Sequence, residues 1–207
     1  MIIEVCAESY EYTLMAEKAG ADRIELCKDL HLDGLTPDYE SAKRTIDALK
    51  IPVFILIRPR AGDFIYSNEE FELMKSDIVK FKEMGCKGIV SGILNNDNSI
   101  DIKRTNELVK FSRPLEFTFH RAFDVVSDPL KEIENLIEIG VNRLLTSGQK
   151  DKAIEGLELI KELKNISKNR IIIMPGSGIS NTNLKKFNSF NEIHGSFKDG
   201  MPIINKH

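Results

Sequence analysis

The stretch Lys18-Ala-Gly-Ala-Asp-Arg-Ile-Glu-Leu26 reads as the end of a helix, a glycine turn, two connecting residues and a strand. Two later stretches follow the same plan, Glu83-Met-Gly-Cys-Lys-Gly-Ile-Val-Ser91 and Glu138-Ile-Gly-Val-Asn-Arg-Leu-Leu-Thr146. Any connection from a helix to a strand has this general form, so the repeat alone does not fix the number of units. It does indicate a chain built from alternating strands and helices.

Short β-type runs recur along the whole chain, with starts 21 to 35 residues apart. A strand, a returning helix and two loops occupy about this length. Between the runs the apolar period becomes helical, as at Phe71, Met74, Ile78 and Phe81, and a capping box is expected from Ser67 to Glu70 just before them. The predicted strands are 2–6, 23–27, 53–57, 88–92, 115–120, 143–148, 171–175 and 192–196.

Eight strand–helix units favour closure into a TIM-like (β/α)8 barrel over an open, doubly wound sheet. The open sheet usually carries a glycine-rich phosphate loop at its first strand–helix turn. Here that turn is Cys6-Ala-Glu-Ser-Tyr10, which contains no glycine. The chain has 207 residues and shows no linker or low-complexity tract, so we expect a single α/β barrel domain over residues 1–207.

Composition narrows the class of function. The 29 Lys and Arg residues against 32 Asp and Glu residues give a net charge of −3, which argues against binding to nucleic acid. No apolar run approaches the roughly 18 residues of a membrane span, and no secretory signal is recognised. Three cysteines are too few for a disulfide framework, so a cytoplasmic location is expected. Cys86 is expected to pack at the opposite rim, and the apolar segment Met201-Pro-Ile-Ile204 suggests a contact surface between copies.

Barrel enzymes place their chemistry at the carboxyl ends of the strands. Period two puts Glu4 with Cys6, and Glu25 with Cys27, on inward faces, and buried carboxylates need cations. The cations expected there are Arg58, Arg60 and Arg121. The set is either a structural ion-pair network or a catalytic site. In the second case His120 is the general acid or base, Glu25 or Asp124 is its partner, and Arg58 positions the substrate.

The turn Pro175-Gly-Ser-Gly178 follows the seventh predicted strand, where barrels often hold a phosphate or another anion. A tight turn that needs glycine only for its dihedral angles has the same pattern. The candidate anion-binding residues are Arg60, Gly176, Ser177, Gly178, His194 and Ser196.

Cys6 and Cys27 end neighbouring strands, which lie about 4.8 Å apart in a sheet. Two thiolates at that separation can hold a soft ion such as Cu(I) in near-linear geometry. Inward side chains of neighbouring barrel strands usually fall in different layers, however, and a buried cysteine often serves as a small apolar residue. Spacing alone leaves both interpretations open.

These stretches resemble the CutC family, which is named for copper homeostasis. The resemblance runs from residue 2 to about residue 201, with two small departures: Asp33 stands where a glycine is usual before Gly34, and Ser177 stands within the usual glycine-rich turn. The matching segments are Glu4-Val-Cys6, Gly20-Ala-Asp-Arg-Ile-Glu-Leu-Cys27, Gly34-Leu-Thr-Pro37, Ile57-Arg-Pro-Arg-Ala-Gly-Asp-Phe64, Thr118-Phe-His-Arg-Ala-Phe-Asp124, Leu145-Thr-Ser-Gly148, Met174-Pro-Gly-Ser-Gly178 and His194-Gly-Ser196.

The resemblance implies a TIM-like barrel in a cytoplasmic protein associated with copper handling. It also implies that Cys6 and Cys27 are the Cu(I) ligands, and Met174 is a candidate soft third ligand. The rival hypothesis is a barrel enzyme that acts on a small anionic or phosphorylated metabolite. Copper binding needs the sulfur atoms and is indifferent to His120 and Arg58, whereas the enzyme needs those two residues and can spare Cys6.

Overall fold

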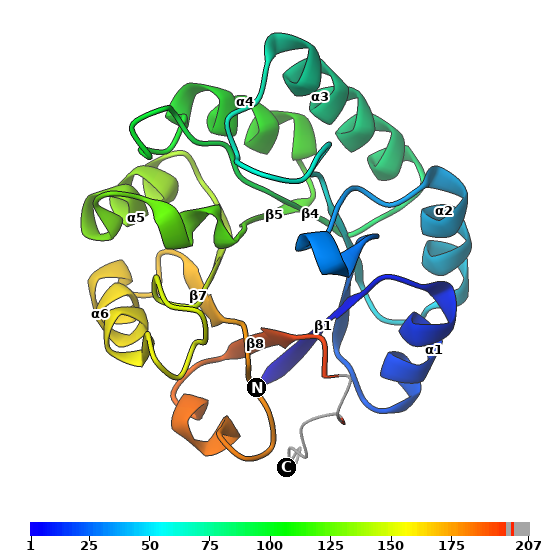
Figure 1. Ribbon diagram of the computed structural model, residues 1–207. Helices are drawn as coiled ribbons and strands as arrows, with labels where there is room; N and C mark the ends of the chain where they lie inside the picture. The colour runs from blue at the N-terminus through cyan, green and yellow to red at the C-terminus, as the bar shows by residue number, and fades with distance from the viewer. Residues whose placement is uncertain (198–199, 201–207) are drawn as a thin grey trace.

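Eight parallel strands form one sheet in the order β7-β6-β5-β4-β3-β2-β1-β8 in the computed structural model, which describes residues 1–197 and 200. A bridge between Gly176 and His194 joins the end of β7 to β8, so the sheet curls into a nearly closed barrel (Figure 1). The predicted (β/α)8 barrel is confirmed. The strands are β1 (Ile2–Ala7), β2 (Arg23–Leu26), β3 (Val53–Leu56), β4 (Gly88–Ser91), β5 (Glu116–Phe119), β6 (Arg143–Thr146), β7 (Ile172–Pro175) and β8 (Glu192–Gly195).

The helices form a ring outside the strands (Figure 1). Ser67 and Glu70 make the predicted capping box at the start of α3. Short 3-10 turns follow three strands: η1 (Leu30–Leu32), η2 (Arg121–Val125) and η3 (Leu184–Phe187). Between β7 and β8 only η3 stands in place of a helix. The α-helices are α1 (Tyr10–Lys18), α2 (Tyr39–Ala48), α3 (Asn68–Glu83), α4 (Ile102–Ser112), α5 (Pro129–Glu138) and α6 (Leu157–Ser167).

The main apolar core lies between the barrel and the helices, where outward side chains such as Ile24, Ile55 and Ile89 are fully buried. The inside of the barrel, unlike this apolar core, contains both charged and aromatic side chains. The guanidinium carbon of Arg23 lies 4.7 Å from the centre of the Phe54 ring, and that of Arg143 lies 5.3 Å from it. Phe54 with Arg23 and Arg143 forms the part of the barrel interior that is called the barrel floor below, in which one aromatic ring contacts two cations.

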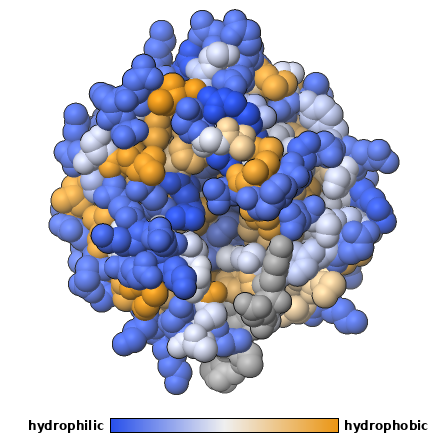
Figure 2. Space-filling model, in the orientation of Figure 1, coloured by the Kyte–Doolittle hydropathy of each residue, from blue (hydrophilic) through white to orange (hydrophobic). Residues whose placement is uncertain are grey.

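The carboxyl ends of the strands meet at the face that Figure 1 presents, where η1 lies over the opening. This face is hollowed near its centre, with hydrophilic side chains around the hollow (Figure 2). No helix in the described part of the chain is long and apolar enough to cross a membrane. The apolar segment 201–204, suggested above as a contact surface, lies outside the described residues.

Candidate functional site

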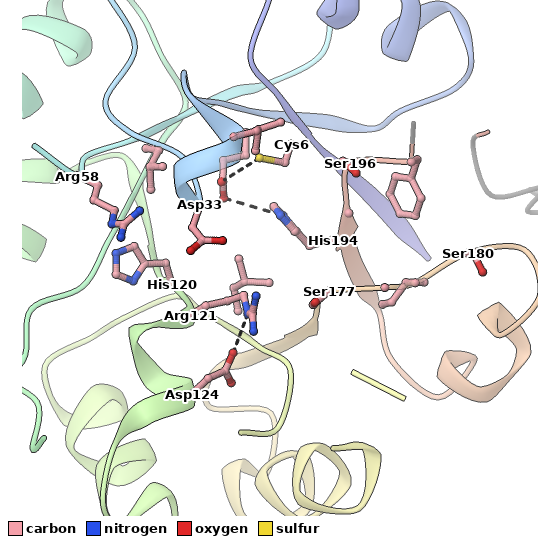
Figure 3. A pocket seen from close by; sticks show the side chains of 18 of the residues that line it. Cys6, Asp33, Arg58, His120, Arg121, Asp124, Ser177, Ser180, His194 and Ser196 are labelled. Carbon is pink, nitrogen blue, oxygen red and sulfur yellow. Dashed lines mark hydrogen bonds and ion pairs between the residues drawn. The ribbon is translucent and has the colours of Figure 1, made fainter. Parts of the chain in front are cut away.

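A cavity of about 930 Å³ opens at the carboxyl ends of the strands (Figure 3). Small-molecule sites typically have volumes of roughly 300–1,000 Å³. Of the residues selected from the sequence, five do not line its wall: Glu4, Cys27, Arg60, Met174 and Gly176. The selected residues that do line it are Cys6, Glu25, Arg58, His120, Arg121, Asp124, Ser177, Gly178, His194 and Ser196. The barrel thus gathers side chains that are far apart in the sequence around one basin.

Cys6 and Cys27 form a buried pair of thiols at the edge of this cavity. Their Sγ atoms lie 3.6 Å apart, although β1 and β2 pair with Cys6 opposite Glu25. The thiols therefore meet diagonally across two strands, and the layering argument against their contact is wrong here. The hydrogen bond with Cys27, burial, and the charge of Glu25 together raise the pKa of Cys6 well above its usual value.

Glu25 and His194 lie beside Cys6. The Cys6 thiol donates to Glu25 Oε1 at 3.6 Å, and His194 Nδ1 lies 3.9 Å from Glu25 Oε2. One potential ligand atom from each of these three buried residues lies within 4.8 Å of the other two, as the donors to a single metal ion would. Burial raises the pKa of Glu25 to about 7, although the charge of His194 opposes the shift.

Glu4 is hydrogen-bonded to the imidazole of His194. Its Oε1 atom lies 2.8 Å from His194 Nδ1. Burial disfavours the charged imidazole, but the charge of Glu25 and the bond to Glu4 outweigh this and raise the pKa of His194. Burial likewise opposes the ionised form of Glu4, yet Arg23 and His194 lower its pKa to about 2.

The cations that neutralise the buried carboxylates are Arg23 and Arg143. Arg23 donates to both Glu4 and Glu192, and Arg143 Nε donates to Glu192 Oε2 at 2.6 Å. Arg23 also donates to Met174 Sδ at 3.4 Å. Met174 is fully buried beneath the cavity and does not line it, so the structure does not support this sulfur as a third ligand of an ion in the cavity.

The prediction that Arg58, Arg60 and Arg121 supply these cations is wrong. Arg23 and Arg143 are the first residues of β2 and β6, at the amino ends of these strands. Their long side chains extend from there into the barrel interior. A sequence signal was present: Arg23 stands two residues before Glu25, so period two puts both on the inward face. Arg60 instead pairs with Glu70 at 2.7 Å, outside the cavity, which removes it from the candidate anion site.

Asp124 organises a loop and does not serve as a partner of His120. Its carboxylate accepts bonds from the Thr146 hydroxyl at 2.5 Å, the Ser147 amide at 3.0 Å and Arg121 Nε at 2.8 Å. Glu25, the other predicted partner, contacts Cys6 and His194. The predicted pairing of His120 with a carboxylate is therefore not formed: Asp124 is held by nearer donors, and Glu25 lies against Cys6 and His194.

The glycine turn after β7 offers fewer donors than its sequence suggests. The Gly176 amide donates to the Thr146 carbonyl at 3.0 Å, and the Ser177 hydroxyl donates to the Asp151 carbonyl at 2.6 Å. The following η3 is only four residues long, so no full helix end points at the turn. Gly178, Ser196 and His194 remain on the cavity wall as candidate contacts.

Comparison with known proteins gives the family. The family model described as "CutC family" matches residues 1–199. This chain belongs to the CutC family. It is 47% identical over 185 residues to the human protein named copper homeostasis protein cutC homolog, covering 89% of this chain and 68% of that protein. It is 45% identical to the CutC protein of Pasteurella multocida, covering 96% and 82%.

Comparison with solved structures supports the same family and the same fold. The CutC structure from Streptococcus agalactiae superposes with a TM-score of 0.89 at 33% identity, covering 95% of this chain and 98% of that one. An aldolase called QR15 superposes with a TM-score of 0.70 at 15% identity, covering 95% and 89%. At that identity the aldolase shows only that the barrel fold is shared.

His120 makes this CutC-family chain sensitive to acid. Burial, reinforced by the positive charge of Arg58, lowers the pKa of His120 from 6.5 to about 3. The unfolded chain therefore takes up a proton near pH 6.5 that the folded chain refuses, so this group costs stability as the pH falls from about 6.5 to about 3.

The matched variant is His120→Asn, whose amide can still accept from the Ala122 N–H but does not titrate. Between about pH 5.5 and pH 4, the free energy of unfolding of the wild type is expected to fall more steeply than that of the variant, by up to about 1.4 kcal/mol per pH unit. Urea titrations in a buffer free of carboxylates measure both slopes. Equal slopes would show that His120 takes up its proton in the folded state.

Proposed function

We propose that this chain handles copper and binds Cu(I) through the thiolates of Cys6 and Cys27. The observation that carries the proposal is the contact of the two Sγ atoms, 3.6 Å apart at the edge of the mouth cavity. The human relative's name, copper homeostasis protein cutC homolog, supports the same metal. Soft thiolate ligands favour Cu(I) over hard cations.

The sulfur atoms of Cys6 and Cys27 suit a copper ion, but in a bent geometry and not in the near-linear geometry expected from the sequence. With metal–sulfur bonds of roughly 2.3 Å, the value for zinc thiolates, two sulfurs on opposite sides of an ion are about 4.6 Å apart. The thiols here are closer than that, at 3.6 Å. The spacing therefore suits a bent pair with a third donor better than the near-linear pair expected from the sequence. His194 is placed to be that donor, because its ring lies within 4.8 Å of Cys6 Sγ.

A reducing compartment is part of the proposal. Cys6, Cys27 and Cys86 are all free thiols, and Cu(I) binding requires the first two to stay reduced. We propose the cytoplasm as the place where the chain works, because the thiol pools there keep cysteines reduced.

The test is a titration of reduced protein with Cu(I) in competition with a coloured chelator. The wild type is expected to bind one Cu(I) per chain. In the double variant Cys6→Ser, Cys27→Ser the affinity is expected to fall at least about a hundredfold, since both soft ligands are lost. Cys86→Ser is the matched control, because Cys86 is also buried but does not line the cavity. Unchanged affinity in the double variant would remove the proposed site.

Two single variants in the same titration test whether His194 or Met174 is the third ligand of the copper ion. His194→Asn is expected to weaken Cu(I) binding, whereas Met174→Leu is expected to leave it unchanged. The opposite pattern would place the methionine sulfur on the ion and would contradict the position that the structure gives it.

A further inference from the structure

Arg58 is a buried cation on the cavity wall without an anion. It stands just after β3, and its Nη1 atom donates to the carbonyls of Leu32 at 2.7 Å and Gly34 at 2.9 Å. Its Nη2 atom donates to the carbonyl of Gly62 at 3.0 Å. Within residues 1–197 and 200, no carboxylate forms an ion pair with it. Buried charges are normally paired with opposite charges, so this one lacks its usual complement.

Neutral groups surround the rest of the guanidinium. The Phe64 ring centre lies 5.1 Å from Arg58 Cζ. The buried hydroxyl of Tyr66 also faces Arg58, and it stays neutral because burial raises the pKa of Tyr66 to about 12. Asp33 lies near Arg58 at the mouth, but its side chain is exposed and forms no ion pair with it (Figure 3).

His120 stands beside Arg58 and adds a fixed N–H donor (Figure 3). Its Nδ1 atom accepts from the Ala122 amide at 3.2 Å, which puts the proton of the neutral ring on Nε2. Nε2 is buried and has no partner among the described residues. The ring cannot turn away freely, because Phe64 packs on it with centroids 4.9 Å apart and Gly92 backs it closely.

We infer that the mouth cavity binds a small organic carboxylate, whose anionic group pairs with Arg58 and accepts a hydrogen bond from His120 Nε2–H. Such a ligand supplies in one group a counter-charge for Arg58 and an acceptor for the unpartnered His120 Nε2–H. Guanidinium groups are well suited to carboxylates, and a buried donor without an acceptor is costly.

The rest of the wall specifies the class of ligand further. Leu56, Leu145 and Phe197 give the cavity an apolar side that can hold the body of the ligand. Arg121 on the wall is already paired with Asp124, and His194 with Glu4. Arg58 is therefore left as the one wall cation without an ion pair among the described residues, and a single negative charge balances it where a dianion such as phosphate would exceed it. A monocarboxylate with an apolar body therefore fits best.

The residues of this site differ from the proposed copper ligands, although both sets lie in the same cavity. Arg58 and His120 follow β3 and β5, whereas Cys6 belongs to β1 and His194 to β8. The inference does not rest on copper binding, and its test uses metal-free protein. The Cys6→Ser, Cys27→Ser variant is expected to lose copper and to keep the carboxylate, so failure of one proposal leaves the other standing.

The probe is benzoate, and benzamide is its neutral counterpart of the same shape. Ligand-observed NMR with metal-free wild-type protein is expected to show saturable binding of benzoate at least about tenfold tighter than that of benzamide or inorganic phosphate. Arg58→Gln and His120→Asn are each expected to weaken benzoate binding by about tenfold. Arg60→Gln is the matched control, because Arg60 stands two residues away but is paired with Glu70 outside the cavity.

The comparison of benzoate with benzamide needs only the wild type, so it remains decisive even if Arg58→Gln loosens the loop that Arg58 ties down. Equal affinity for the charged and the neutral probe would overturn the inference. An Arg60→Gln variant that weakens benzoate as much as Arg58→Gln would also overturn it.

Discussion

Replacing Arg23 by methionine is expected to lower the free energy of unfolding by about 3–5 kcal/mol, the range seen when one member of a buried ion pair is removed. Arg23 donates to both Glu4 and Glu192 at the barrel centre, and all three side chains are almost completely buried. Methionine fills much of the same volume but leaves two carboxylates short of a counter-charge. Urea unfolding of the two proteins at neutral pH measures the difference.

The control is Arg170→Met, which removes an exposed pair with Glu134 that is 2.6 Å long. Its expected cost is far smaller than that of Arg23→Met, because solvent screens such an exposed pair. A double variant, Arg23→Met with Glu4→Gln, is expected to recover part of the loss, since one uncompensated charge is then gone. If Arg23→Met costs no more than Arg170→Met, the network does not stabilise the barrel centre.

Phe54→Ala is expected to cost about 3–5 kcal/mol, as large-to-small changes of buried aromatic residues do. The ring fills the space above Gly88, where an added Cβ would come within 2.5 Å of three ring carbons. It also supports the guanidinium groups of Arg23 and Arg143 at 4.7 and 5.3 Å. The variant therefore loses packing and cation–π contacts together.

The same urea titration measures Phe54→Ala against Phe111→Ala. Phe111 lies on α4 and keeps 39% of its surface exposed, so its replacement is expected to cost clearly less. Equal costs for the two variants would mean that Phe54 is not the central support of the barrel floor.

Local patterns predicted most of the fold. Strand alternation, the glycine turn at Gly20 with its repeats at Gly85 and Gly140, and the Ser67–Glu70 capping box depend on short-range geometry, which a sequence states directly. The missing helix between β7 and β8 was not predicted. Asn183 there accepts from the Ser180 amide and donates to the Gly178 carbonyl, and such side-chain bonds to the backbone favour a turn over a helix.

Most of the residues selected from the sequence line one cavity, but their partners were not predicted. Period two correctly brought Glu4, Cys6 and Glu25 inward, yet it gave no information on how far a long side chain reaches. Arg23 and Arg143 travel from the amino ends of their strands to the barrel centre. Asp124 was expected, as an alternative to Glu25, to partner His120 at the barrel mouth, whereas the Thr146 hydroxyl and the Ser147 amide hold it.

The contact of Cys6 with Cys27 also depends on more than strand spacing. Layer rules describe Cβ positions, and the Sγ atoms lean toward each other within an apolar pocket of Phe54, Leu56 and Val90. That pocket belongs to β3 and β4, so the sequence around either cysteine does not reveal it.

X-ray absorption at the copper edge of the Cu(I)-loaded, reduced protein tests the thiol site most directly. The predicted result is two sulfur neighbours per copper in the wild type and in Cys86→Ser, and one in either Cys6→Ser or Cys27→Ser. A shell of nitrogen and oxygen alone, or two sulfurs retained in both single variants, would contradict the proposal that these two cysteines hold the ion.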